Sequence, residues 1–110
     1  MQFVSAILDR FTGRGRAMSR YRRGIEKARH HDQQGAIDDY SATIEMPDAP
    51  PDVKAMAFYN RGLARLSQDD PQAIDDLHHV LEIPQTPSSV RTEAKRKLLR
   101  IQRRVDKQSD

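Results

Sequence analysis

The amino-acid sequence predicts an all-α fold in which pairs of antiparallel helices are repeated along the chain. The main observation behind this prediction is an internal repeat, because residues 17–24 align with residues 55–62 at an offset of 38, with five of eight positions identical. The offset then becomes 37, where residues 35–40 align with residues 72–77. Self-similarity at a fixed period is typical of helical repeat proteins. We therefore expect two repeats and the start of a third.

Within each repeat, the apolar side chains follow the spacing of a helix. They recur three and four residues apart at Ile37, Tyr40 and Ile44, and again at Ile74, Leu77 and Leu81. This period places side chains on one face of a helix, where they can be buried. No segment shows the sustained alternation of apolar and polar residues that strands require.

Signals at the ends of these segments set the expected helix boundaries. A proline follows Met46 and Ile83, and the residue before a proline is pushed out of the helical region, so both are predicted helix ends. Asp32 and Asp70 are predicted to cap the helices that follow them. Two glycines in residues 13–16 predict a flexible joint. The expected helices lie near residues 2–12, 16–30, 33–46, 53–67, 71–83 and 88–107.

The 110 residues have room for one compact domain, yet the charge is unevenly distributed along it. Residues 1–31 hold eight basic and two acidic residues, residues 32–84 hold three and eleven, and residues 85–110 hold eight and three. This pattern indicates either charge pairing within the molecule or two separate docking surfaces. We divide the chain into an amphipathic helix with the Gly/Arg joint (1–15), two helix pairs (16–84) and a basic capping helix with its tail (85–110).

Several residues of the two units carry a family likeness: Gly24 and Gly62 in the first helices, Ala36 and Ala73 early in the second helices, Tyr40 and Leu77 one turn later, and Pro47 and Pro84 at the exits. On these residues the chain resembles the tetratricopeptide repeat family over residues 17–94. The resemblance implies a right-handed superhelical stack of antiparallel helix pairs, here with extra helices at both ends. A glycine facing an alanine would let the paired helices approach closely. The repeat is longer than the 34 residues usual in the family.

The same resemblance implies a concave groove lined by the first helices of successive repeats. The lining residues would be Tyr21, Arg22, Arg29, Met56, Tyr59, Asn60, Leu63, Arg96, Lys97 and Arg100. Aromatic, amide and basic groups together suit an extended peptide or helix of acidic character. The implied function is that of a protein-interaction adaptor or assembly module. A terminal-carboxylate clamp of the chaperone-binding type is not expected, because only Asn60 matches its pattern, while Lys97 replaces its final arginine with another cation.

Two other surfaces compete with this groove. The basic terminal segments, above all residues 91–107, predict as an alternative the binding of nucleic acid or of an anionic membrane. Near the N-terminus an apolar stripe predicts a helix that caps the stack, mediates self-association into a homo-oligomer or acts as a targeting segment. Its residues are Phe3, Ile7, Leu8 and Phe11.

Other features of the sequence bound the function by exclusion. The absence of cysteine fits a reducing compartment, and we predict a cytoplasmic protein. No apolar run reaches the roughly 18 residues of a transmembrane helix. Adjacent side chains on a helix diverge, so the paired aspartates are predicted to lie on a solvated outer face, not at a catalytic or metal site. These pairs are Asp38 with Asp39 and Asp75 with Asp76. The histidine pairs lack the spacing of metal ligands, and we expect no cofactor and no enzymatic activity.

Overall fold

The computed structural model describes residues 12–109 and shows an all-helical protein. Its helices, in chain order, are α2 (Gly13–Arg29), α3 (Gln33–Glu45), α4 (Pro51–Ser67), α5 (Gln72–Glu82) and α6 (Ser88–Ser109). No strand occurs in this part of the chain. The predicted all-α class is therefore confirmed, whereas the helix expected near residues 2–12, with Phe3, Ile7, Leu8 and Phe11, lies outside the described residues.

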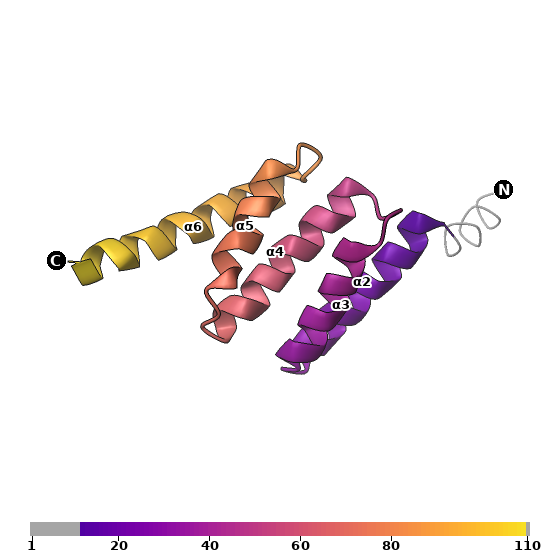
Figure 1. The fold of residues 1–110 in the computed structure, drawn as a ribbon, viewed down its shortest axis with the longest axis horizontal. Coiled ribbons are helices and arrows are strands. Elements are labelled where there is room, and N and C mark those ends of the chain that lie inside the picture. Colours follow the sequence, from indigo (N-terminus) through magenta and orange to yellow (C-terminus); the bar gives the residue numbers. More distant parts are fainter. Residues whose placement is uncertain (1–11, 110) are drawn as a thin grey trace.

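The helices lie side by side in chain order along an elongated molecule, with α2 near one end and α6 at the other (Figure 1). The principal extents are 62 × 29 × 21 Å. Each helix packs against the next; α2 also contacts α4, and α4 contacts α6. Within the described residues, by contrast, α3 and α5 do not contact each other. The first helices of the pairs thus form one continuous layer, and the second helices cover one side of it.

The predicted helix boundaries are mostly confirmed. The Asp32 carboxylate accepts a hydrogen bond from the backbone N–H of Gly35 at 2.9 Å, and the Asp70 carboxylate accepts one from Gln72 at 2.9 Å. Each carboxylate satisfies an amide that the first helical turn leaves without a partner. Met46 and Ile83 have extended ψ angles of 119° and 114° and end α3 and α5, as expected before proline.

The flexible joint predicted at residues 13–16 is wrong. Helix α2 begins at Gly13, and the Thr12 hydroxyl oxygen accepts a hydrogen bond from the backbone N–H of Gly15 at 3.1 Å. Tertiary contacts hold this first turn, because Arg14 pairs with Asp52 of α4 at 3.1 Å. A side chain in place of Gly13 would collide with Asp48. The glycine therefore serves close packing here and does not mark a joint.

Both helix pairs use the same turn, which supports the alignment of the repeats. His31 and Asp69 adopt left-handed φ angles of 63° and 56° just after the first helix of each pair. The next residue then donates its backbone N–H to a carbonyl five residues earlier, at 2.9 Å in both pairs. This is a common way of closing the carboxyl end of a helix. The turn returns the chain directly into the second helix.

Small residues form much of the core where neighbouring helices pack against each other. Three clusters are centred on Ala17, Ala49 and Val53, on Ala36, Tyr40 and Ala57, and on Leu77, Val80 and Ala94. The side chain nearest to each glycine is the large side chain of the second helix, not the alanine that was expected to face it. A Cβ atom on Gly24 would lie 2.5 Å from Cε1 of Tyr40, and one on Gly62 would lie 3.2 Å from Cδ2 of Leu77. The glycines thus make room for the large side chain of the second helix.

Candidate protein-binding surface

The structure brings three of the predicted groove residues together between α2 and α4. The side-chain amide of Asn60 donates to the hydroxyl oxygen of Tyr21 at 2.9 Å and to the backbone carbonyl of Met56 at 3.0 Å. The ring of Tyr21 lies 6.0 Å from the ring of Tyr40, between centroids. Burial raises the pKa of Tyr21, although the hydrogen bond from Asn60 partly opposes this shift. The residues form an ordered junction between the two repeats.

A second junction lies between α4 and α6. Tyr59 packs against the cluster that contains Leu77, Val80 and Ala94. Burial and the negative charge of Glu93 raise the pKa of Tyr59, and the positive charge of Arg96 opposes them. Glu93 in turn accepts a hydrogen bond from Arg96 at 2.6 Å. Tyr59 is therefore close enough to Glu93 and Arg96 for their charges to act on its hydroxyl group.

The remaining predicted groove residues are more dispersed. Arg22 and Arg29 are exposed on α2; Arg29 pairs with Glu26 at 3.5 Å, whereas Arg22 has no ion pair within residues 12–109. Leu63 is partly buried on α4. Lys97 and Arg100 line a separate cavity further along α6. The surface thus has two ordered junctions, with basic side chains around them.

The prediction that the paired aspartates are solvated is wrong for one member of each pair. Asp38 and Asp75 are exposed, but Asp39 and Asp76 are each 1% exposed. Neighbouring side chains on a helix do diverge, but the second aspartate of each pair turns toward cations on the preceding helix. Cations that recur at i and i+4 on α2 and on α4 are the sequence signal for this arrangement.

Three cations of α2 surround Asp39. Nε of Arg20 lies 2.8 Å and Nζ of Lys27 lies 2.9 Å from its carboxylate, and Nε of Arg23 lies 3.7 Å away. Burial alone would raise the pKa of this carboxyl group. The hydrogen bond from Lys27 and the charges of all three cations outweigh burial, so the pKa of Asp39 is lowered from its ordinary 3.8.

Asp76 holds the equivalent position in the second pair. Its carboxylate accepts two hydrogen bonds from Arg61, at 2.8 and 3.1 Å, and one from Arg65 at 2.8 Å. Arg61 also donates to the hydroxyl of Ser41 on α3 at 3.0 Å. The two buried aspartates therefore fasten each second helix to the first helix of its own pair.

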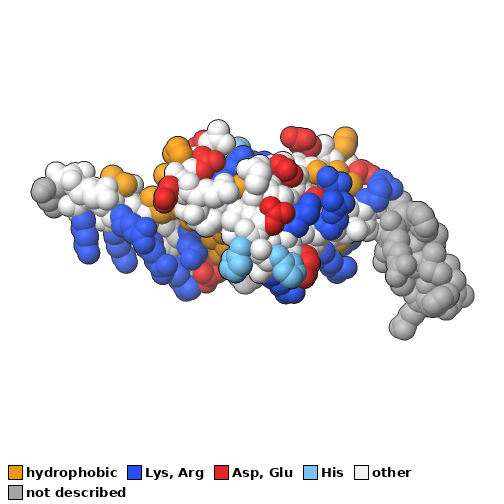
Figure 2. All heavy atoms as spheres, turned by 90° about the horizontal axis from the view of Figure 1, so that it is seen from below, with side chains coloured by type: hydrophobic (Ala, Val, Ile, Leu, Met, Phe, Trp, Pro, Cys, Tyr) orange, Lys and Arg blue, Asp and Glu red, His pale blue; other side chains and the backbone are white. Residues whose placement is uncertain are grey.

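The two basic ends of the sequence differ in how their charge is used. The acidic middle neutralises much of α2, through the Asp39 network and through pairing of Arg14 with Asp52 and of Arg16 with Asp48. On α6, Arg96 pairs with Glu93. The cations that follow Arg96 on this helix make no ion pair within residues 12–109: Lys97, Arg100, Arg103, Arg104 and Lys107. Figure 2 shows Lys and Arg side chains projecting in a row from the α6 end of the molecule. Charge pairing thus neutralises most of α2, whereas these five cations of α6 have no ion pair within the described residues.

Among residues 12–109 no three His, Asp or Glu side chains are grouped so that they could hold a metal ion. None of the described helices combines the length and the hydrophobicity needed to cross a bilayer. No protein-family model, curated protein or solved structure matches this chain significantly.

Proposed function

We propose that the chain is a tetratricopeptide-repeat-like adaptor or assembly module that binds a peptide or helix of a partner protein along α2, α4 and α6. The observation that carries the proposal is the asymmetric layering. First helices contact one another across the repeats, while α3 and α5 are separated. Such spacing supports a stack that curves toward its first helices, as in a right-handed superhelix with a concave inner face.

The equivalence of α6 with α4 supports the same proposal. Ala57 on α4 packs against Tyr40 of the preceding second helix, and Ala94 on α6 packs against Leu77 of its own preceding helix. Both alanines are fully buried. Helix α6 therefore occupies the place of a third first helix and extends the inner face beyond the two complete pairs.

The chemistry of this face suits a partner with acidic character. Tyr21 and Asn60 are hydrogen-bonded to each other and Tyr59 is partly buried, so little side-chain entropy would be lost if they bind a partner. Exposed Arg22 and Arg29 can pair with carboxylates at the edge of a bound peptide. Aromatic and arginine side chains are also the types enriched at the energetic centres of protein interfaces.

Photo-crosslinking tests the location of the binding face. A photoreactive phenylalanine analogue replaces Leu63 on the inner face of α4 in one variant and exposed Gln72 on α5 in a matched control. In cells that express the chain, we expect the Leu63 variant to form a discrete adduct with a partner protein. The Gln72 variant should form none. An adduct only at Gln72, or adducts at neither site, would contradict the proposed face.

The alternative function is the binding of nucleic acid or an anionic membrane through the unpaired cations of α6. It predicts an affinity for RNA or anionic vesicles that falls steeply with salt, because bound cations release counterions from the polyanion. Neutralising Arg96, Arg100 and Arg103 should then abolish binding. A salt-independent or absent signal would remove this alternative.

A further inference from the structure

Helix α6 continues well beyond the helices that support it. It has 22 residues, whereas its neighbour α5 has 11. Residues 102–109 are all exposed. Three large apolar side chains are strongly exposed in the described part of the chain: Ile74 at 37%, Leu99 at 59% and Val105 at 48%. All three lie at this end of the molecule, where α5 and α6 diverge.

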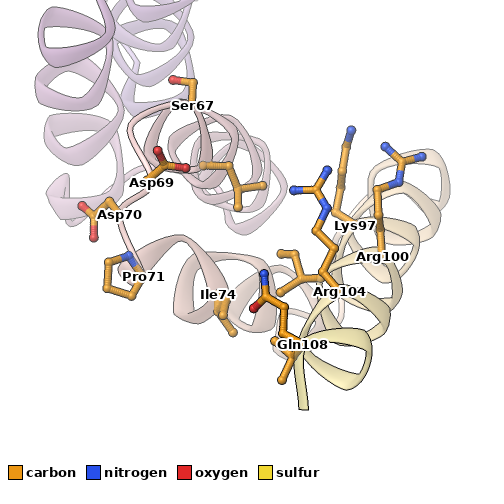
Figure 3. A pocket seen from close by; sticks show the side chains of 12 residues that line it. Ser67, Asp69, Asp70, Pro71, Ile74, Lys97, Arg100, Arg104 and Gln108 are labelled. Carbon is orange, nitrogen blue, oxygen red and sulfur yellow. The ribbon is translucent and has the colours of Figure 1, made fainter. Parts of the chain in front are cut away.

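A cavity of about 530 Å³ opens between α6 and the turn that joins α4 to α5. Figure 3 shows Lys97, Arg100 and Arg104 rising from α6 on one side of it, with Asp69 and Asp70 on the turn opposite. Its apolar floor consists of Leu66, Ile74, Ile101 and Val105. The cavity therefore combines a basic wall, an acidic turn opposite it and an apolar floor.

A second cavity of about 480 Å³ lies along α5 and α6. It shares Ile74, Ile101 and Val105 with the first cavity. Its further lining consists of three leucines and three polar residues: Leu81, Leu98, Leu99, His78, Lys95 and Gln102. The shared residues form an apolar seam between the two cavities. Exposed apolar side chains that are rimmed by polar ones occur at interaction sites.

The repeat explains why this surface has the shape of a helix-docking site. At the offset of 37, Leu99 corresponds to Gly62, the position at which α4 receives Leu77 of α5. The same position on α2, Gly24, receives Tyr40 of α3. Each first helix thus has a side that accepts a following helix, and on α6 that side is covered by nothing within residues 12–109. The leucine keeps an incoming helix further away than α5 is from α4.

The unpaired cations identify the chemistry of an incoming helix. Lys97, Arg100 and Arg104 are three and four residues apart, so they share one side of α6, and none has an ion pair within residues 12–109. On α2 and α4 the cations of the first helix hold a carboxylate of the second, Asp39 or Asp76. The α6 cations occupy other positions of the repeat, those of Asn60, Leu63 and Ser67, but carboxylates on an incoming helix would still form charge-assisted pairs with them.

We propose that the α5–α6 end binds an amphipathic acidic helix of a partner protein. Its apolar side packs on Ile74, Ile101 and Val105, and its carboxylates pair with the three cations of the basic wall. At the offset of 37, Lys97 and Arg100 correspond to Asn60 and Leu63, so the basic wall continues the inner face of the proposed function at its α6 end. The site needs neither the Tyr21–Asn60 junction nor Tyr59. If binding at one surface is disproved, binding at the other surface can still be tested.

A polyanion is the less suitable occupant of this site. Phosphates would be attracted by every cation of the α6 end, including Arg103 and Lys107, which line neither cavity. They would also gain nothing from the apolar seam, whose burial favours a partner with apolar side chains of its own. Substitution of cations inside and outside the cavities can therefore distinguish the binding of a protein helix from the binding of RNA.

The test begins with a displayed library of helical peptides of about 16 residues, a little over four turns. Leucines are fixed at helical spacing, all other positions are random, and selection is on the immobilised full chain. We expect the selected peptides to be enriched in Asp and Glu. The affinity of the best peptide, measured by fluorescence anisotropy, should fall about tenfold in the Arg100→Gln/Arg104→Gln variant because two charge-assisted contacts are lost.

The matched control, Arg103→Gln/Lys107→Gln, removes the same charge from the same helix and should bind within about twofold of the parent chain. Val105→Asn should weaken binding about fivefold through the apolar seam alone. Circular dichroism checks that these exposed substitutions leave the helices intact. A library without acidic enrichment, or equal losses in both double variants, would overturn the proposal. So would a single-stranded RNA probe that binds more tightly than the peptide and is insensitive to Val105→Asn.

Discussion

The guanidinium of Arg61 holds the carboxylate of Asp76 with two hydrogen bonds, from Nη2 to Oδ1 at 2.8 Å and from Nε to Oδ2 at 3.1 Å. The third bond of Arg61, to Ser41, ties α4 to α3 as well as to α5. The arginine side chain is 15% exposed and the aspartate 2%. This pair links three consecutive helices at the centre of the molecule.

Arg61→Lys should therefore destabilise the fold. Lysine keeps the charge but cannot make the two parallel bonds and the bond to Ser41 together, so the free energy of unfolding should fall by about 2 kcal/mol. Arg23→Lys is the control, because Arg23 is 59% exposed and lies 3.7 Å from Asp39, and it should change stability by less than about 0.5 kcal/mol. Urea denaturation measures both. Equal losses in the two variants would argue against Arg61 as the link between helices.

The Asp39 network predicts a specific dependence of stability on pH. The pKa of Asp39 is lowered in the folded state, so its ionised form stabilises the fold above the unfolded pKa of about 3.9. This contribution is lost as pH falls through the lower, folded pKa. The stability difference between the parent chain and Asp39→Asn should thus be constant at about 2 kcal/mol above pH 5 and shrink below pH 4. Denaturation series at several pH values measure it, with exposed Asp38→Asn as control. A difference that grew in acid would have the wrong sign.

The close approach of Gly24 to Tyr40 predicts an asymmetry between the two repeats. Gly24→Ala would force Cβ to within 2.5 Å of the Tyr40 ring and should cost about 2 kcal/mol. Gly62→Ala has 3.2 Å to the more flexible Leu77, and the better helix propensity of alanine should keep the change within about 1 kcal/mol.

A double-mutant cycle checks the physical cause. The cost of Gly24→Ala should be smaller by about 1 kcal/mol when Tyr40 is replaced by leucine, the residue of the other repeat. Simple additivity of Gly24→Ala and Tyr40→Leu would show that the clash is not the reason.

The left-handed turn residues predict a stabilising change. His31 has a φ of 63°, a region that costs a residue with a side chain about 1 kcal/mol. His31→Gly should raise the free energy of unfolding by about 0.5 kcal/mol once the greater freedom of glycine in the unfolded chain is included. His30→Gly is the matched control at φ −92°, where glycine should destabilise. Thermal melts of the two variants should move in opposite directions; movement in the same direction would refute the turn argument.

The sequence predicted the helices well because their signals are local. Apolar spacing, aspartate caps and prolines each act within a few residues, and the observed boundaries of the five described helices lie within three residues of those expected. The glycines near residue 13 were misread because their role depends on Asp48, which is distant in the sequence. Local flexibility and tertiary close packing favour the same residue type.

The candidate site was predictable only in part. Repeat alignment was sufficient to place Tyr21 and Asn60 on neighbouring first helices, where they meet. It could not show that Asp39 and Asp76 are buried, because that depends on how the second helix is rotated against the cations of the first. Nor could it show that α6 diverges from α5, so the cavity that Lys97 and Arg100 line at the α6 end was not predicted.

The most direct test of the binding face is the affinity of the crosslinked partner, once purified, for two variants of equal charge. Arg22→Gln/Arg96→Gln removes two cations from the inner face, and Arg103→Gln/Lys107→Gln removes two from the far end of α6. We predict that calorimetry will show binding weakened about tenfold in the first variant and nearly unchanged in the second. Equal affinities in both variants, or a loss confined to the second, would contradict binding along α2, α4 and α6.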